Sequence, residues 1–226
     1  MNTATCFTPI KVCGLTREQD VDAAVRAGVQ AIGFVLYPRS PRHVSAKRAA
    51  ELARRLPAFV SPVLLFVNES ESAVAQASAA VPGAWLQFHG DESPDFCQRV
   101  AQGLGRRWLR AARIPLGDDA PPFDLVKYAA EHSHAHALLL DAHVEGYGGG
   151  GKAFNWSRLP TSVNAHLVLS GGLTPANVGD GLRALRGRGQ SLAVDVSSAV
   201  ETAKGIKDAG LINDFVAAVR AADQLG

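Results

Sequence analysis

The stretch Pro9-Ile10-Lys11-Val12-Cys13-Gly14 reads as an apolar β-strand that ends in a turn. A helix start follows at once, because Thr16 is a candidate N-cap, Gln19 stands three residues later, and apolar residues recur at helical spacing over 21–25. A strand, a short loop and a helix make one βα unit. The stretch therefore predicts a fold built from βα units, with the Cys13 thiol at the carboxyl end of the first strand.

Apolar strand-like runs recur along the whole chain. They are Ile10–Cys13, Ala31–Leu36, Pro62–Val67, Ala84–Phe88, Trp108–Ala111, Ala137–Leu140, Leu167–Leu169 and Leu192–Val196. Amphipathic stretches alternate with them, at Arg17–Ala27, Ser45–Arg55, Ser70–Ala80, Ser93–Gly103, Phe123–His132, Pro175–Leu185 and Leu211–Leu225, with a shorter one at Asn155–Leu159. Two helix starts carry a cap residue followed by proline, at Ser93-Pro94 and Thr174-Pro175.

This alternation predicts a parallel sheet with right-handed crossovers. Eight such units in 226 residues favour closure into a barrel over a doubly wound sheet. We therefore expect an α/β fold, a single-domain (β/α)8 TIM barrel of eight parallel strands that spans residues 1–226. In such a barrel, polar and reactive residues at the carboxyl ends of the strands are typical of the active site.

Charge and cysteine content exclude several classes of protein. The chain has 23 basic and 21 acidic residues with a net charge of +2 and no basic block, so we expect no nucleic-acid partner. No apolar run approaches the ~18 residues that span a membrane, and the first ten residues do not resemble a signal peptide. Cys6, Cys13 and Cys97 are odd in number and lack metal-ligand spacing, which indicates a reduced, cytoplasmic protein without a metal.

Two strand ends carry reactive side chains. Cys13 ends the first strand, and Asp141 follows the run Leu138-Leu139-Leu140 of the sixth. A thiol and a carboxyl group that face each other across a barrel mouth would provide a base and an acid. The alternatives are a small buried hydrophobe for Cys13 and a cap or turn residue for Asp141.

The last two strand-to-helix turns are rich in small residues. Ser170-Gly171-Gly172 follows the seventh strand and Ser197-Ser198 follows the eighth. Barrels frequently bind phosphate at these two places, through backbone N–H groups. Either turn alone would be an ordinary tight turn, but together they predict a phosphorylated ligand.

Two further loops contain candidate ligand contacts. Arg39 and Arg42 lie in a loop stiffened by Pro38 and Pro41, which suits bidentate capture of a carboxylate, although a solvated surface arginine is the common alternative. His89 ends the fourth strand and either lines the site or is a wall residue.

The segment 145–152, Glu-Gly-Tyr-Gly-Gly-Gly-Gly-Lys, is the most glycine-rich part of the chain. Glycines permit unusual backbone angles and close approach to a ligand, as in mobile covers. The alternative is a flexible linker.

Lys11 and Asp195 share strand-face parity with Cys13 and Ser197, so both should point into the barrel. The first and eighth strands are neighbours in a closed barrel, and a buried ammonium and carboxylate there are expected to pair. The alternative is that Asp195 contacts substrate while Lys11 pairs elsewhere.

Together these motifs resemble the phosphoribosylanthranilate isomerase family of tryptophan biosynthesis, over nearly the whole chain. The matching segments are Lys11-Val12-Cys13-Gly14, Gly33-Phe34-Val35 through Ser40-Pro41-Arg42, Gln87-Phe88-His89-Gly90, Leu139-Leu140-Asp141, Gly149 through Trp156, Leu169 through Leu173, and Ala193 through Ser198. The resemblance implies a cofactor-independent Amadori rearrangement of a small phosphorylated substrate, with Cys13 as general base and Asp141 as general acid. It places the anthranilate carboxylate on Arg42, and the expected substrate-binding set is Arg42, His89, Gly171, Gly172, Asp195, Ser197 and Ser198.

The chain departs from the family pattern at a few positions. Ala199 stands where the family usually has glycine, so the backbone there should not need positive φ. Asn155 stands where the family commonly has aspartate, so one helix-capping residue type replaces another. A strand-five lysine of the family corresponds to Arg110. None of these positions is the expected acid or base.

Two alternative functions stay open from the sequence. One is another phosphosugar barrel isomerase, such as the histidine-pathway sugar isomerase, which the strand-one thiol disfavours. The other is a phosphate-ligand binding module without catalysis, which the presence of both Cys13 and Asp141 disfavours. The oligomeric state, monomer or homodimer, is also left open.

Overall fold

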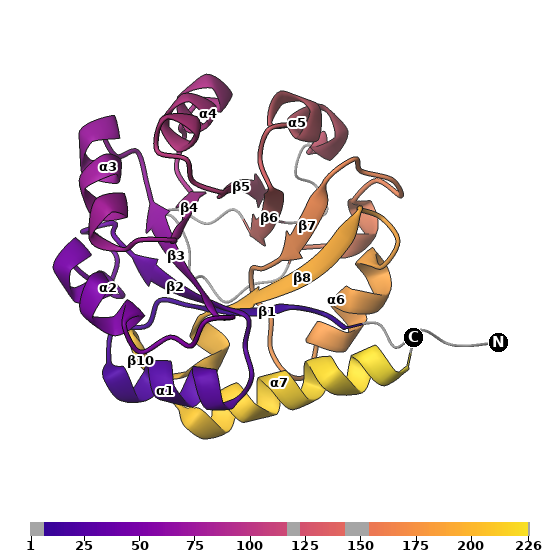
Figure 1. The fold of residues 1–226 in the computed structure, drawn as a ribbon. Helices are drawn as coiled ribbons and strands as arrows, with labels where there is room; N and C mark the ends of the chain where they lie inside the picture. Colours follow the sequence, from indigo (N-terminus) through magenta and orange to yellow (C-terminus); the bar gives the residue numbers. More distant parts are fainter. Residues whose placement is uncertain (1–6, 117–122, 143–153, 226) are drawn as a thin grey trace.

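The computed structural model describes residues 7–116, 123–142 and 154–225. Within them, eight parallel strands pair in chain order and close into a barrel (Figure 1). The strands are β1 (Ile10–Cys13), β2 (Ala31–Val35), β3 (Ser61–Phe66), β4 (Trp85–Phe88), β5 (Trp108–Ile114), β6 (Ala137–Ala142), β7 (His166–Leu169) and β8 (Ser191–Val196). The predicted (β/α)8 barrel is confirmed, and each predicted strand overlaps its observed counterpart.

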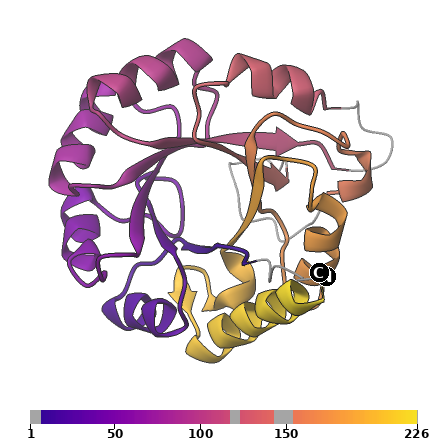
Figure 2. The ribbon, with the colours of Figure 1, turned by 45° about the vertical axis from the view of Figure 1, so that its right-hand side comes forward.

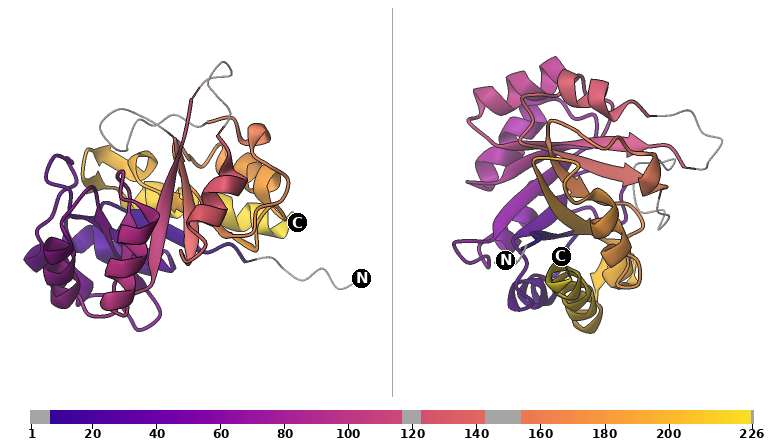
Figure 3. Two further views of the ribbon diagram at one scale, coloured as in Figure 1. Left: turned by 90° about the horizontal axis from the view of Figure 1, so that it is seen from above. Right: turned by 90° about the vertical axis from the view of Figure 1, so that its right-hand side faces the viewer.

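The helices form a ring outside the strands (Figure 2). They are α1 (Glu18–Arg26), α2 (Ala46–Ala53), α3 (Glu71–Ala80), α4 (Pro94–Gly103), α5 (Leu125–Glu131), α6 (Val178–Leu185) and α7 (Ala209–Gln224), with short 3₁₀ turns η1 (Trp156–Arg158) and η2 (Ser198–Val200). A small antiparallel hairpin, β9 (Glu201–Ala203) with β10 (Ile206–Lys207), follows η2. Helices α1 and α7 lie side by side on the outside of the barrel (Figure 3).

Strand residues alternate between two apolar layers. Ile10 and Val12 belong to the large cluster between strands and helices, whereas Leu109, Ala111 and Leu139 belong to a smaller cluster inside the barrel. Because both faces of each strand are buried, the strands appear in the sequence as continuous apolar runs. Residues of the inward parity near the carboxyl ends are therefore the ones that reach the barrel mouth.

The helix starts followed local hydrogen bonding rather than the sequence pattern alone. Ser93 caps α4 through its side chain with Pro94 in the first turn, as predicted. The prediction for Thr16 was wrong, because its hydroxyl donates to the Gly205 carbonyl at 2.7 Å and Arg17 occupies the N-cap without a side-chain bond. Helix α6 begins only at Val178, three residues after Pro175, because Asn177 accepts from Thr174 N and holds a separate turn there.

Two other predictions concern specific segments. Asn155 caps η1 by accepting from Ser157 N, as predicted. Ala199 has no positive φ, since Asn68 is the only non-glycine residue with one in the described part of the chain. The glycine-rich segment 145–152 and Cys6 lie outside the described residues. None of the described helices combines the length and apolar character needed to cross a membrane.

Candidate active site

Cys13 ends β1 with its side chain inside the barrel and is only 5% exposed. It packs with Val35, Leu65 and Val67, the inward residues of the neighbouring strands near their carboxyl ends. Its register partner on β2 is Gly33, and a Cβ at that glycine would lie 2.6 Å from the Cys13 Sγ. The glycine therefore provides the space that the thiol occupies.

The charge below the thiol is an ion pair. Lys11 Nζ donates to Asp195 Oδ1 at 2.8 Å, and the two residues are register partners across the β1–β8 junction. The predicted pair is thus confirmed. Ser170 Oγ also donates to the Asp195 carboxylate, at 3.3 Å. The pair is almost fully buried, so its charges are only weakly screened by water.

This environment sets the protonation of both groups. Burial raises the pKa of the Cys13 thiol above 9.0, and the Lys11 ammonium opposes that shift. Burial alone would lower the pKa of Lys11, but the charges of Asp195 and Cys13 raise it above 10.5. Lys11 consequently stays a cation beside the thiol and favours its ionised form.

Asp141 belongs to β6 and is held by two neighbours. Its Oδ1 accepts from the Ala142 backbone N at 2.9 Å, and its Oδ2 lies 3.1 Å from His89 Nε2. The other ring nitrogen of His89 lies 3.0 Å from Gln87 Nε2, while Gln87 Oε1 is buried without a partner in the described residues. With the Gln87 amide turned round, its oxygen would accept a hydrogen bond from His89 Nδ1–H, and His89 Nε2 would then accept a hydrogen bond from a protonated Asp141 carboxyl group. His89 is therefore a hydrogen-bond partner of Asp141.

Arg42 belongs to the β2–α2 loop, and its side chain takes part in a buried ion cluster with Glu201 and Lys207. Its Nε and Nη2 donate to the two carboxylate oxygens of Glu201 at 2.8 and 2.7 Å. Lys207 Nζ donates to the same carboxylate at 2.8 Å and to the Ser197 carbonyl at 3.0 Å. Burial opposes ionisation of Glu201, but its bonds to Arg42 and Lys207 hold its pKa below the usual value. No carboxylate of the described residues meets the guanidinium edge formed by Nη1 and Nη2, and this edge can receive one.

The turns after β7 and β8 present backbone N–H groups. Gly171 and Gly172 have φ of 74° and 65°, and a Cβ on Gly171 would lie 2.5 Å from the Ala142 N and 2.8 Å from Asp141 Oδ1. Among the described residues, no acceptor is found for the backbone N–H of Gly171, Gly172 or Ser198. Because β7 pairs with β8, the two turns lie on neighbouring strands. Together these N–H donors suit an anion.

The sequence model described as "N-(5'phosphoribosyl)anthranilate (PRA) isomerase" matches residues 10–218 of the chain. The chain belongs to this family. A relative named N-(5'-phosphoribosyl)anthranilate isomerase from Methylibium petroleiphilum is 59% identical over 96% of this chain and 95% of its own.

Solved structures of phosphoribosylanthranilate isomerases have the same fold. The Thermotoga maritima protein is 32% identical, with a TM-score of 0.79 over 95% of this chain and 100% of its own. A second structure, of an isomerase in complex with reduced 1-(o-carboxyphenylamino)-1-deoxyribulose 5-phosphate, is 29% identical, with a TM-score of 0.76 over 95% of this chain and 100% of its own.

In this member of the phosphoribosylanthranilate isomerase family, the carboxyl ends of the strands form the barrel mouth, and most of the predicted site residues lie there. Cys13, His89 and Asp141 point inward from β1, the β4 end and β6. Asp195 lies one layer deeper in the barrel than Cys13 and forms the ion pair with Lys11. Ser197 donates to the Cys13 carbonyl at 3.0 Å, which ties the β8 turn to the thiol strand. Arg39, by contrast, is exposed on the loop.

Arg110, the residue of β5 that corresponds to the family lysine, lies outside the barrel interior. Leu109 and Ala111 point into the barrel, so Arg110 points outward, where it donates to Glu92 at 2.8 Å and to the carbonyls of Phe88 and Gly90. It braces the turn after His89. The basic residue of β5 with inward parity is Arg113, the register partner of Asp141, and its guanidinium pairs with Asp91.

Three charged residues near the site were not identified from the sequence: Glu201, Lys207 and Arg113. Glu201 and Lys207 belong to the short β9–β10 hairpin, which has no recognisable apolar period. Arg113 could be identified as a site residue only by knowing that β5 continues to Ile114. Within the described residues, no group of three or more His, Cys, Asp or Glu side chains is placed to hold a metal ion.

Proposed function

We propose that this chain converts N-(5-phosphoribosyl)anthranilate into 1-(2-carboxyphenylamino)-1-deoxyribulose 5-phosphate by general acid–base catalysis, as an isomerase of tryptophan biosynthesis. One observation carries this proposal. A single barrel mouth holds a buried thiol, a hydrogen-bonded carboxyl group and an arginine with one open edge. These are a base, an acid and a carboxylate receptor.

Substrate binding would use the two ends of the mouth. The phosphate accepts hydrogen bonds from the free N–H groups of the Gly171-Gly172 and Ser197-Ser198 turns. The anthranilate carboxylate meets the Nη1–Nη2 edge of Arg42, since Glu201 already occupies the Nε–Nη2 edge. Glu201 thus fixes the guanidinium plane, and the sugar is held between the two anchors.

The first chemical step needs an acid. Asp141, protonated and paired with His89, gives its proton to the furanose ring oxygen. The bond from that oxygen to C1′ breaks while the anthranilate nitrogen lone pair forms a C=N bond to C1′. The product is an open-chain, positively charged Schiff base.

The second step needs a base. The Cys13 thiolate removes the proton from C2′, and the electron pair of the C–H bond forms a C1′=C2′ double bond as the C=N electrons return to nitrogen. The resulting enolamine tautomerises to the ketone by gaining a proton at C1′ and losing the one on its C2′ hydroxyl. The cationic Schiff base and the Lys11 ammonium both favour the thiolate that this step requires.

We also propose that residues 1–226 make one barrel domain, that the protein works in the cytoplasm, and that its ligand is a small phosphorylated molecule rather than a nucleic acid or membrane. The reaction as written uses no cofactor. The choice between monomer and homodimer is a matter for sedimentation of the purified protein.

Loss of anthranilate fluorescence during turnover of N-(5-phosphoribosyl)anthranilate tests the function. Wild-type protein should consume the substrate, and Asp141→Asn should lower kcat by about 10²–10⁴-fold while still binding a reduced product analogue. Cys97→Ser is the matched control, because Cys97 is a buried thiol between strands and helices whose pKa burial raises to about 12. No consumption by the wild type would reject the function, and a fully active Asp141→Asn would reject the acid.

A further inference from the structure

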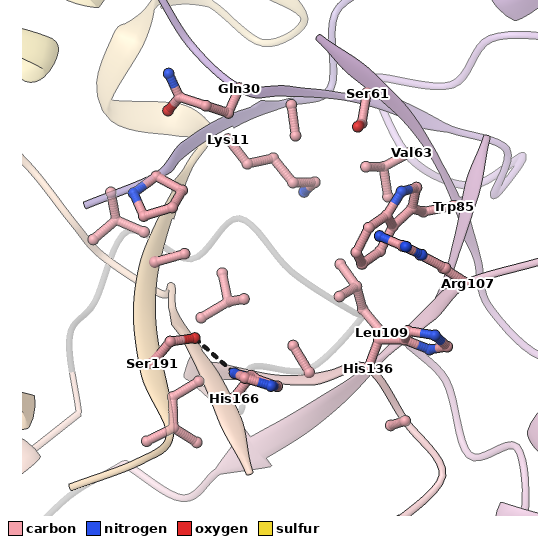
Figure 4. Close-up of a pocket in the computed structure, with 18 of the residues that line it drawn as sticks. Lys11, Gln30, Ser61, Val63, Trp85, Arg107, Leu109, His136, His166 and Ser191 are labelled. Carbon is pink, nitrogen blue, oxygen red and sulfur yellow. Dashed lines mark hydrogen bonds between the residues drawn. The ribbon is translucent and has the colours of Figure 1, made fainter. Parts of the chain in front are cut away.

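A cavity lies at the opposite end of the barrel from Cys13 and Asp141. Its volume is about 700 Å³, and it is lined by residues that begin the strands, among them Ser61, Trp85 and Ser191 (Figure 4). Ligand pockets for small molecules typically measure about 300–1,000 Å³. The cavity therefore has the size of a ligand site, yet the isomerase chemistry proposed above does not use it.

The cavity exists because the lowest inward layer of the barrel is poorly filled. Ala31, Ala137 and Ala193 occupy inward positions on β2, β6 and β8, where barrels commonly carry bulky branched side chains. Val63 and Leu109 form the rest of the apolar wall. Three alanines on separate strands leave a space that no neighbouring side chain closes.

The ionisable side chains that line this space are all basic. Its basic and histidine lining residues are Lys11, Arg107, His134, His136 and His166, and none of the lining residues is Asp or Glu. The Lys11 charge is already matched by Asp195. The positive charge that Asp195 does not match is therefore that of Arg107, at the opening of this cavity.

Arg107 is exposed, and its guanidinium lies 5.3 Å from the centre of the Trp85 ring. In the part of the chain that the structure describes, this guanidinium forms no hydrogen bond or ion pair. His136 meets the same ring edge-on, at 5.8 Å between centroids. Its Nδ1 accepts a long bond from Trp108 N at 3.5 Å, which leaves Nε2–H as a donor in the neutral ring. Figure 4 shows Trp85, Arg107 and His136 on one side of the cavity.

We propose that this cavity is a second ligand site, for a small aromatic anion. The ring of the ligand fills the apolar space beside the three alanines and contacts Trp85. Its carboxylate or sulfonate meets the open guanidinium of Arg107 and the N–H of His136. An unpaired cation beside an aromatic ring, above an apolar space without carboxylates, selects for both the ring and the negative charge.

The test uses 2-naphthoate as probe, with 2-naphthylmethylammonium as the same ring with the opposite charge. Titration is followed by calorimetry and by the NMR signal of the Trp85 indole N–H, with the reduced product analogue saturating the other end of the barrel. We expect 2-naphthoate to bind with one site per chain, to shift the Trp85 signal and to bind at least about tenfold more tightly than the ammonium probe.

Three variants locate the site. Arg107→Gln should weaken 2-naphthoate binding about tenfold or more and leave isomerase turnover unchanged. Arg54→Gln, an exposed arginine that does not line this cavity, should leave the binding unchanged. Ala193→Leu should abolish binding by filling the space, with circular dichroism to verify its fold.

Several results would overturn the proposal. They are equal affinity for the two probes, binding unaffected by Arg107→Gln, or shifts confined to residues at the Cys13 end. Sedimentation as a dimer that excludes 2-naphthoate would assign the cavity to a second copy of the chain instead.

Discussion

Replacement of Lys11 by methionine removes half of the buried ion pair under the thiol. Methionine keeps the length and the apolar stem of lysine but leaves the Asp195 carboxylate without its 2.8 Å partner. The remaining donor is Ser170 Oγ at 3.3 Å. Asp195 then carries a buried charge with a single, longer hydrogen bond, which is strongly unfavourable.

The magnitude follows from the geometry. At 2.8 Å, two unit charges attract by about 6 kcal/mol for an effective dielectric constant of about 20. Part of this loss is recovered, because Lys11 lines the cavity at the strand starts and its loss opens a path for water toward the Asp195 carboxylate. We therefore expect Lys11→Met to lower the free energy of unfolding by about 3–5 kcal/mol. The wild-type contribution is fully present below pH 10.5 and is lost as pH rises through the Lys11 pKa of the folded protein, which lies above 10.5.

Urea unfolding at pH 7 measures this change. With a slope of about 2–3 kcal/mol per molar urea for a protein of this size, the midpoint should fall by about 1–2.5 M. The double variant with Asp195→Leu removes both charges and should recover most of the loss. A Lys11→Met midpoint within about 0.3 M of the wild type, or a double variant less stable than the single one, would refute the reasoning.

The other predictions concern ligand contacts and the thiol. Arg42→Ala should weaken calorimetric binding of the reduced product analogue by about 1.5–3 kcal/mol, and Glu201→Gln should weaken it in the same direction by releasing the guanidinium; unchanged affinity in Arg42→Ala would exclude the carboxylate contact. Titration of the Cys13 thiolate by ultraviolet absorbance, in a background of Cys6→Ser and Cys97→Ser, should give a midpoint above pH 9.0, moving higher still in Lys11→Met; a midpoint near neutral pH would contradict the burial argument. Gly171→Ala should lower kcat by up to ~10²-fold, because its Cβ would meet Ala142 N at 2.5 Å and displace Asp141; full activity would show that the turn tolerates a side chain.

The barrel and its mouth were predictable because they depend on short-range rules. Strands buried on both faces appear as apolar runs, and parity then places Lys11 and Asp195 inside the barrel. Closure of the sheet makes β1 and β8 neighbours. The topology therefore made a Lys11–Asp195 ion pair one of the two arrangements expected from the sequence. Asp141 could be identified because it is a charged residue directly after the apolar run of the sixth strand.

The rest depended on long-range contacts or on exact element ends. Glu201 reaches Arg42 across 159 residues of chain, from a hairpin too short for any periodic signal. Arg110 and Arg113 differ in role because β5 continues to Ile114, three residues beyond the predicted end, which gives only Arg113 an inward parity at the mouth. Thr16 does not cap α1 because its hydroxyl donates to the carbonyl of Gly205, in the turn of the same hairpin.

The most direct test of the proposed chemistry is turnover of N-(5-phosphoribosyl)anthranilate carrying deuterium at C2′, with wild-type protein and Cys13→Ser compared at one pH. Proton removal by the Cys13 thiolate predicts that the wild type releases deuterium from C2′ as it turns over. It also predicts that Cys13→Ser is slower by about 10²–10⁴-fold while binding the reduced product analogue as tightly as the wild type does. Deuterium loss from C2′ at a near-wild-type rate in Cys13→Ser would contradict the account.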